Sequence, residues 1–217
     1  MKRIVTLVLA LCMLLTLAAC GTQGTASSQT NVQTNTEPTP APNYDFDLLD
    51  EAVTYYADIE IADYGTITVQ LDQSAAPVTA ANFVNLAKSG FYDGLTFHRI
   101  IAGFMMQGGD PNGNGTGGSD TKIKGEFAVN GHNNPISHER GVISMARAKA
   151  YDSASSQFFI MHADANYLDG QYAAFGHVTE GMDVVDAVCA AAQPTDNNGS
   201  IAKDAQPVIV SVTIREA

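Results

Sequence analysis

The stretch FHRIIAGFMMQGGD, residues 97–110, decides the fold and raises the question of function. It begins like a buried strand, because large apolar side chains dominate its first part. Three polar side chains interrupt that pattern, namely His98, Arg99 and Gln107. A charge inside an apolar core is costly unless it is paired. The stretch therefore predicts a strand and leaves open why a core segment should carry an arginine.

The chain before this stretch predicts a hairpin and a helix. Residues 55–72 alternate apolar and polar side chains on either side of residues 63–65, which is typical of a β-hairpin. Residues 74–90 carry Pro77 in the first turn, an apolar face and a final glycine, which together predict a helix.

The chain after it predicts short strands. Between residues 95 and 175, short apolar runs are separated by Gly, Asn, Asp and Ser. Residues 181–191 have the apolar stripe of a second helix, and residues 206–217 close as a strand. Many short strands with only two helices predict a mainly β fold, an antiparallel barrel capped by helices.

The start of the chain has the pattern of an export signal. Lys2 and Arg3 precede an apolar run of about 16 residues, which is short of the roughly 20 needed to cross a bilayer. An uncleaved anchor is the alternative. The run ends in LAACG, which resembles the lipobox of bacterial lipoproteins, in which the cysteine is acylated. We therefore predict a lipoprotein signal peptide over residues 1–19 and lipidation of Cys20, the alternative being an ordinary signal peptide with a chance cysteine.

A polar segment follows the cysteine. Residues 21–43, GTQGTASSQTNVQTNTEPTPAPN, contain almost nothing that could form a core. We interpret residues 20–53 as the lipidated cysteine and a disordered tether, and residues 54–217 as one domain. With Cys12 removed and Cys20 acylated, Cys189 has no partner for an internal disulfide.

Composition and motifs exclude several function classes. The formal net charge is −12 and no basic cluster is present, which argues against nucleic acid as a partner. Asp110, Asn112 and Asn114 start a calcium-loop pattern, but Thr121 stands where the bidentate Glu is needed. The histidines lack helical ligand spacing, and no nucleotide loop or Gly-x-Ser-x-Gly elbow is present. We therefore expect no metal and no cofactor, and if the protein is an enzyme, we expect a reaction that breaks no bond.

Five motifs in order identify a family. FHRIIAGFMMQGGD is followed by GTGG (115–118), ISMARA (143–148), SQFFI (156–160) and LDGQYAAFGHV (168–178). Together, over residues 59–214, they resemble the cyclophilin-type peptidyl-prolyl cis-trans isomerases. The resemblance implies a closed eight-stranded antiparallel β-barrel with a helix over each end.

The resemblance also implies the roles of individual residues. Arg99 corresponds to the catalytic arginine, and Gln107 is the second catalytic residue, which supports the arginine or holds a substrate carbonyl. His98 lies in the pocket wall or directly behind it. The proline pocket would be lined by Phe104, Met105, Phe159 and Leu168, for which ordinary core packing is the alternative. The adjoining groove would be shaped by Gly115, Ala146, Arg147, Ala148 and Gln157.

Three positions depart from the animal members of that family. Tyr167 replaces a tryptophan, Tyr172 replaces a pocket histidine, and Arg147 replaces a commoner asparagine. We expect weak binding of cyclosporin, because the missing tryptophan donates a hydrogen bond to the drug in sensitive members.

Export signal and resemblance together predict a monomeric folding helper at the outer face of a bacterial membrane. Its substrates would be proline-containing segments of unfolded or partly folded exported proteins, and its membrane partner the lipid bilayer that holds the anchor. A binding module that merely holds proline segments is one alternative, and a surface adhesin, which no sequence feature supports, is another.

Overall fold

The computed structural model describes residues 43–217, and its first strands form where alternation predicted them. Strand β1 (Tyr55–Ile61) pairs antiparallel with β2 (Gly65–Leu71). The turn between them holds Asp63 at φ 67° and Gly65 at φ 121°. Glycine adopts such left-handed backbone without the steric cost of a side chain. The predicted hairpin is confirmed.

Helix α1 (Pro77–Lys88) begins at the predicted proline, but the carboxylate that caps it is far away in the sequence. Ala76 at the N-cap offers no side-chain hydrogen bond. The buried carboxylate of Glu126 instead accepts hydrogen bonds from the backbone N–H groups of Val78 and Thr79, at 3.1 and 2.8 Å. A negative charge is stabilising there, because the first N–H groups of a helix lack intrahelical partners.

The other elements agree with the predicted short strands and long loops, and α2 (Met182–Ala191) is the predicted second helix. The remaining strands are β3 (Phe97–Ile101), β4 (Met105–Gly108), β5 (Val142–Met145), β6 (Phe158–Met161), β7 (Ala173–Glu180) and β8 (Ile209–Glu216). Three short 3₁₀ helices are η1 (Ala128–Asn130), η2 (Asn166–Leu168) and η3 (Lys203–Ala205).

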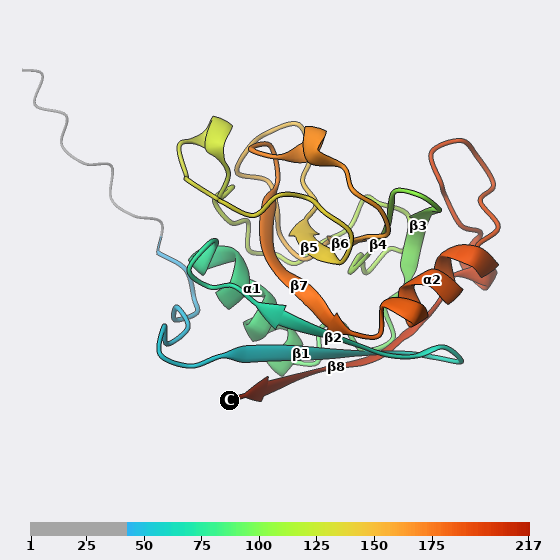
Figure 1. The fold of residues 1–217 in the computed structure, drawn as a ribbon, viewed down its shortest axis with the longest axis horizontal. Coiled ribbons are helices and arrows are strands. Elements are labelled where there is room, and N and C mark those ends of the chain that lie inside the picture. The colour runs from blue at the N-terminus through green and yellow to red at the C-terminus, as the bar shows by residue number, and fades with distance from the viewer. Residues whose placement is uncertain (1–42) are drawn as a thin grey trace, which may run out of the picture. The chain divides into compact units, whose positions relative to one another are not determined.

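The eight strands form one antiparallel sheet in the order β3-β4-β6-β5-β7-β2-β1-β8. The sheet curls, and α1 and α2 lie on opposite sides of β7 in the view of Figure 1. The predicted mainly β fold with antiparallel strands and two helices is confirmed. A closed barrel is not what the structure shows. Where the edge strands β3 and β8 approach each other, an isolated bridge pairs Thr96 with Val208 and backbone hydrogen bonds join residues 94–97 to 207–209. No strand ladder pairs β3 with β8, and the sheet is a curled half-barrel.

The packed part of the chain begins before Thr54. The rings of Tyr44 and Phe46 stack with centroids 5.1 Å apart, and both pack against the core. The hydroxyl of Tyr44 accepts a hydrogen bond from the N–H of Lys124 at 3.0 Å. These aromatic residues, which we expected in the tether, thus bury apolar surface on the domain. The predicted signal peptide, Cys20 and most of the tether lie outside the described residues.

Within residues 43–217, no helix combines the length and the apolar character that crossing a membrane requires.

Candidate active site

Strand pairing places three of the predicted site residues in one row. Arg99 of β3 lies directly opposite Gln107 of β4, and Gln107 lies opposite Phe159 of β6. Directly opposite residues of neighbouring strands present their side chains to the same face of a sheet. An arginine, a glutamine and a phenylalanine therefore line one surface of the half-barrel.

Hydrogen bonds continue this row into a chain of amides. Arg99 Nη1 donates to Gln107 Oε1 at 3.3 Å, and Gln107 Nε2 donates to Gln157 Oε1 at 2.9 Å. Gln157 Nε2 then donates to the carbonyl oxygen of Gly117 at 2.8 Å. Each glutamine accepts at its oxygen and donates at its nitrogen, so the chain fixes the orientation of both amides.

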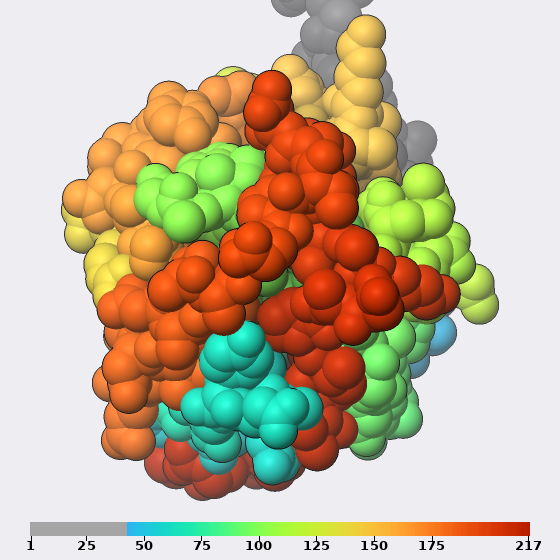
Figure 2. Space-filling view, turned by 90° about the vertical axis from the view of Figure 1, so that its right-hand side faces the viewer, coloured from blue at the N-terminus to red at the C-terminus, as the bar shows by residue number. Residues whose placement is uncertain are grey.

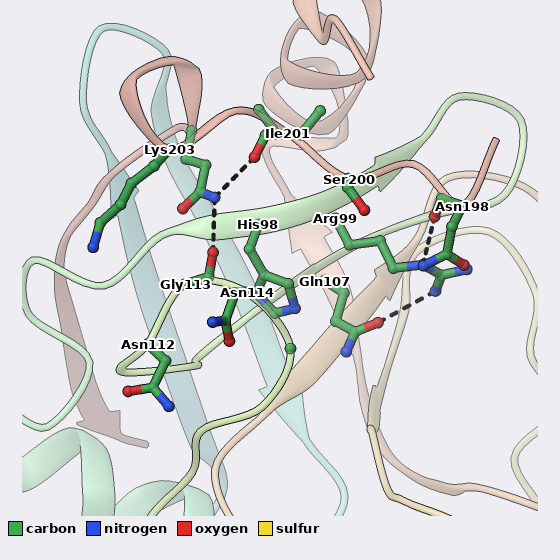
Figure 3. Close-up of a pocket in the computed structure, with 12 residues that line it drawn as sticks. His98, Arg99, Gln107, Asn112, Gly113, Asn114, Asn198, Ser200, Ile201 and Lys203 are labelled. Atoms are coloured by element: carbon green, nitrogen blue, oxygen red, sulfur yellow. Dashed lines mark hydrogen bonds between the residues drawn. The ribbon is translucent and has the colours of Figure 1, made fainter. Parts of the chain in front are cut away.

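The other side of the guanidinium is held by a backbone carbonyl. Arg99 Nε donates to the carbonyl oxygen of Asn198 at 2.7 Å (Figure 3). This loop is shaped by the carboxylate of Asp196, which accepts from the N–H groups of Asn198 and Ser200. In the space-filling view, the green segment near residue 100 reaches the surface beside the red loop after α2 (Figure 2). No sequence pattern pointed to Asn198, because any residue supplies a carbonyl.

The guanidinium of Arg99 is half-buried and has no carboxylate bound to it in the described part of the chain. Burial lowers the pKa of Arg99 below its ordinary value, and electrostatic interactions with Tyr172, Asp196 and Tyr167 oppose that shift. An arginine remains charged at any working pH. The ring of Phe104 lies 6.0 Å from the guanidinium carbon. A fixed cation thus stands at the edge of apolar surface.

A cavity of about 190 Å³ opens beside this cation. Its walls combine the expected apolar side chains with the polar row, and they are formed by Arg99, Phe104, Met105, Gln107, Ala146, Arg147, Phe159, Leu168 and Tyr172. Met105, Phe159 and Leu168 are also buried in a small hydrophobic cluster separate from the main core. These three side chains therefore both pack in a hydrophobic cluster and line the pocket, so the two interpretations do not exclude each other.

A second hollow of about 190 Å³ adjoins the first. The two share Gln107, Ala146 and Arg147. The second hollow is also lined by Gly115, Thr116, Gly117, Lys122, Ala148, Ser153, Ser155 and Gln157. All the residues expected in the adjoining groove are thus brought together there.

Two tyrosines complete the apolar pocket differently. Tyr172 belongs to its wall, and its ring meets the ring of Phe159 edge-on at 5.8 Å. Tyr167 lies at the rim instead, 68% exposed, with its ring stacked on Phe104 at a centroid distance of 6.1 Å.

His98 borders a different space from the apolar pocket. It is only 5% exposed, and neither ring nitrogen has a hydrogen-bond partner. It borders an open hollow of about 690 Å³ together with Asn112, Asn114 and Lys203, on the side of Arg99 shown in Figure 3. Burial lowers the pKa of His98, against the attraction of Asp110, so the ring is neutral at pH 7.

A buried histidine that we did not predict supports the pocket from behind. His138 Nδ1 lies 2.8 Å from Asp169 Oδ1, and its Nε2 lies 3.0 Å from Ser144 Oγ. Its ring stacks on Phe159 at 6.0 Å. Because Asp169 directly follows Leu168, this contact ties two parts of the pocket together. A single histidine in ISHERGV has no spacing signal that could have revealed the role.

Comparison with known proteins matches this geometry to one family. Residues 56–214 match the family described as cyclophilin type peptidyl-prolyl cis-trans isomerase/CLD. A peptidyl-prolyl cis-trans isomerase of Helicobacter pylori is 46% identical over 151 residues, covering 69% of this chain and 90% of that protein. Peptidyl-prolyl cis-trans isomerase B of Bacillus subtilis is 49% identical over 123 residues, covering 57% and 82%.

Comparison with solved structures leads to the same family. A crystal structure of a cyclophilin-type isomerase from Cryptosporidium parvum, determined in the presence of the dipeptide Ala-Pro, superposes with a TM-score of 0.65. It is 29% identical in sequence and covers 74% of this chain and 98% of its own. The fold, the motif residues and the relatives agree: this chain belongs to the cyclophilin-type peptidyl-prolyl cis-trans isomerases.

Proposed function

We propose that this isomerase speeds the folding of exported proteins from a lipid anchor, and that Arg99 is its catalytic residue. An X–Pro amide resists rotation because resonance gives its C–N bond double-bond character, with a barrier of roughly 18 to 20 kcal/mol. As the bond twists, conjugation is lost and the proline nitrogen recovers a lone pair. A hydrogen-bond donor placed at that nitrogen stabilises the twisted state more than the planar one, which is how catalysis arises.

The observation that carries the proposal is a guanidinium fixed at the mouth of an apolar pocket. Asn198 and Gln107 hold Arg99 at Nε and Nη1, at 2.7 and 3.3 Å. The donor is therefore positioned before the substrate arrives, and no reorganisation is needed as the bond twists. The apolar pocket receives the proline ring, so one side of the amide is gripped while the other turns. The Ala-Pro dipeptide named for the Cryptosporidium parvum structure is consistent with such a pocket.

The test is the variant Arg99→Ala in the full chain. A charge-assisted hydrogen bond is worth about 1.5 to 3 kcal/mol, so losing it only in the twisted state slows catalysis roughly tenfold to 150-fold. We expect that loss in kcat/KM for a proline tetrapeptide, with the circular dichroism spectrum unchanged. Undiminished turnover would reject Arg99 as the catalytic group.

The location is the second part of the proposal. It is supported by the sequence of residues 1–20 alone, with Cys20 as the acylated residue and the outer face of a bacterial membrane as the site. We expect radiolabelled palmitate to be incorporated into the full-length protein and not into Cys20→Ala. Equal labelling of the two would exclude Cys20 as the anchor.

The clients proposed are proline-containing segments of unfolded or partly folded exported proteins. Refolding of a protein limited by proline isomerisation is slow, taking tens of seconds or longer. We expect catalytic amounts of the isomerase to speed that phase. Activity on a peptide without any effect on refolding would favour the alternative of a binding module.

A further inference from the structure

The arginines of the described residues fall into two groups. Arg140 and Arg215 lie away from both small hollows, and each pairs with a carboxylate, Asp186 at 2.8 Å and Asp58 at 2.5 Å. Arg99 and Arg147 line the apolar pocket, and within residues 43–217 neither makes an ion pair. The chain carries 23 acidic and only 11 basic residues, so carboxylates are abundant. Two unpaired guanidiniums at one site are therefore a specific feature of that site.

Arg147 is held rigidly by its surroundings. Its guanidinium carbon lies 5.1, 5.3 and 4.8 Å from the ring centroids of Phe127, Tyr151 and Tyr172. Its Nε donates to the carbonyl oxygen of Gln171 at 2.9 Å, and Nη1 to that of Ala148 at 3.0 Å. Aromatic faces stabilise a cation without neutralising it. In the described part of the chain Nη2 has no partner, so the group keeps a donor available for a ligand.

The charged side chains that line the second hollow are all positive. Arg147 and the exposed Lys122 are the charged residues among those that line it, and no carboxylate lines it. Arg99 lies on the far side of the shared wall formed by Gln107 and Ala146. The other lining residues are glycines, alanines, hydroxyl residues and amides, none of which adds charge. A carboxylate placed here would meet two cations and no repelling acid.

From this arrangement we propose that the second hollow selects substrate segments carrying an aspartate or glutamate side chain close to the proline. The inference rests on the proposed function, because it places the proline in the adjoining apolar pocket. A segment that extends from that pocket along the shared wall brings a neighbouring side chain to Arg147 and Lys122. The acidic remainder of the molecule repels such a segment, so the selection is local to this hollow.

The experiment compares peptides with one glutamate or one glutamine at each position flanking the proline. We expect kcat/KM to favour glutamate at one position, by roughly two- to fivefold for each partly exposed cation. The ratio of glutamate to glutamine should fall in Arg147→Gln and in Lys122→Gln. It should be unchanged in Lys124→Gln, which removes an equally exposed charge outside the hollow. The preference should also shrink as the ionic strength rises.

Because each ratio is taken within one variant, a general loss of activity cancels. A ratio of one at every position, or a preference that both variants keep, would overturn the selectivity. If no peptide is turned over, the proposed function fails by itself. The same ratio is then measured from peptide dissociation constants, and an equal affinity for glutamate and glutamine peptides overturns the selectivity there too.

Discussion

Gln107 should matter less than Arg99, and the structure indicates by how much. Its hydrogen bond to Arg99 Nη1 is 3.3 Å long, beyond the usual 2.7 to 3.2 Å for N–H···O bonds. The carbonyl of Asn198 holds the same guanidinium at 2.7 Å, and Gln107→Ala leaves that contact in place. A net hydrogen bond is worth about 0.5 to 1.5 kcal/mol. We therefore expect Gln107→Ala to lower kcat/KM roughly two- to thirteenfold.

The assay is kcat/KM on a proline tetrapeptide for Gln107→Ala, Gln157→Ala and Arg99→Ala. Gln157 touches Gln107 and not Arg99, so its variant should lose less than Gln107→Ala. Gln73→Ala is the matched control, because that amide bonds only to backbone carbonyls far from the site. A loss for Gln107→Ala as large as that for Arg99→Ala would refute the reasoning, since Gln107 would then contact the reacting bond itself. No loss at all would refute the amide chain as a positioning device.

Two further predictions concern stability. Burial lowers the pKa of His98 below 6.5, so the unfolded chain binds more protons at this residue than the folded chain does. The contribution of His98 to the free energy of unfolding is therefore fully present above pH 6.5 and decreases as the pH falls below that value. In urea unfolding, His98→Gln should lose less free energy of unfolding between neutral and mildly acid pH than the parent protein does. The control His177→Gln, at an exposed position, should lose as much as the parent. Identical pH dependence in all three proteins would contradict this prediction. Glu126→Gln should lower the free energy of unfolding by about 1 to 3 kcal/mol, because it removes both the charge and one acceptor at the start of α1. The exposed Glu180→Gln is its control, and equal urea midpoints for the two would contradict the capping role.

The elements of this fold follow from signals that are local in the sequence. Alternation predicted the hairpin of residues 55–71, and Pro77 marked the start of a helix. How the edges of the sheet meet is not a local property. It depends on backbone contacts between Thr96 and Val208, residues far apart in the chain. The short aromatic segment at Tyr44 and Phe46 was hidden by the polar stretch before it, although two aromatic side chains bury enough area to hold a segment in place.

The parts of the site that are formed by side chains could be predicted from the sequence, whereas the parts that are formed by backbone groups could not. Arg99 and Gln107 are polar residues in an otherwise apolar stretch, Phe159 lies in a motif that carries the family resemblance, and the structure places the three in one row. Asn198 holds Arg99 through a carbonyl that any residue would supply. His138 acts through its packing on Phe159, and a lone histidine has no spacing that distinguishes support from ordinary burial.

Several buried or structural carboxylates of this acidic chain are bound to backbone N–H groups, while the two site arginines make no ion pair within residues 43–217. Burial raises the pKa of Asp110, yet hydrogen bonds from the N–H groups of Asn112, Asn114 and Gly115 hold it below 3.8. Glu126 is bound at the start of α1. Asp196, whose charge acts on Arg99, is bound within its own turn to the N–H groups of Asn198 and Ser200 and to the hydroxyl of Ser200. Each of these carboxylates shapes a loop or a helix end, and none of them forms an ion pair with the guanidinium at the pocket, which can therefore meet a substrate.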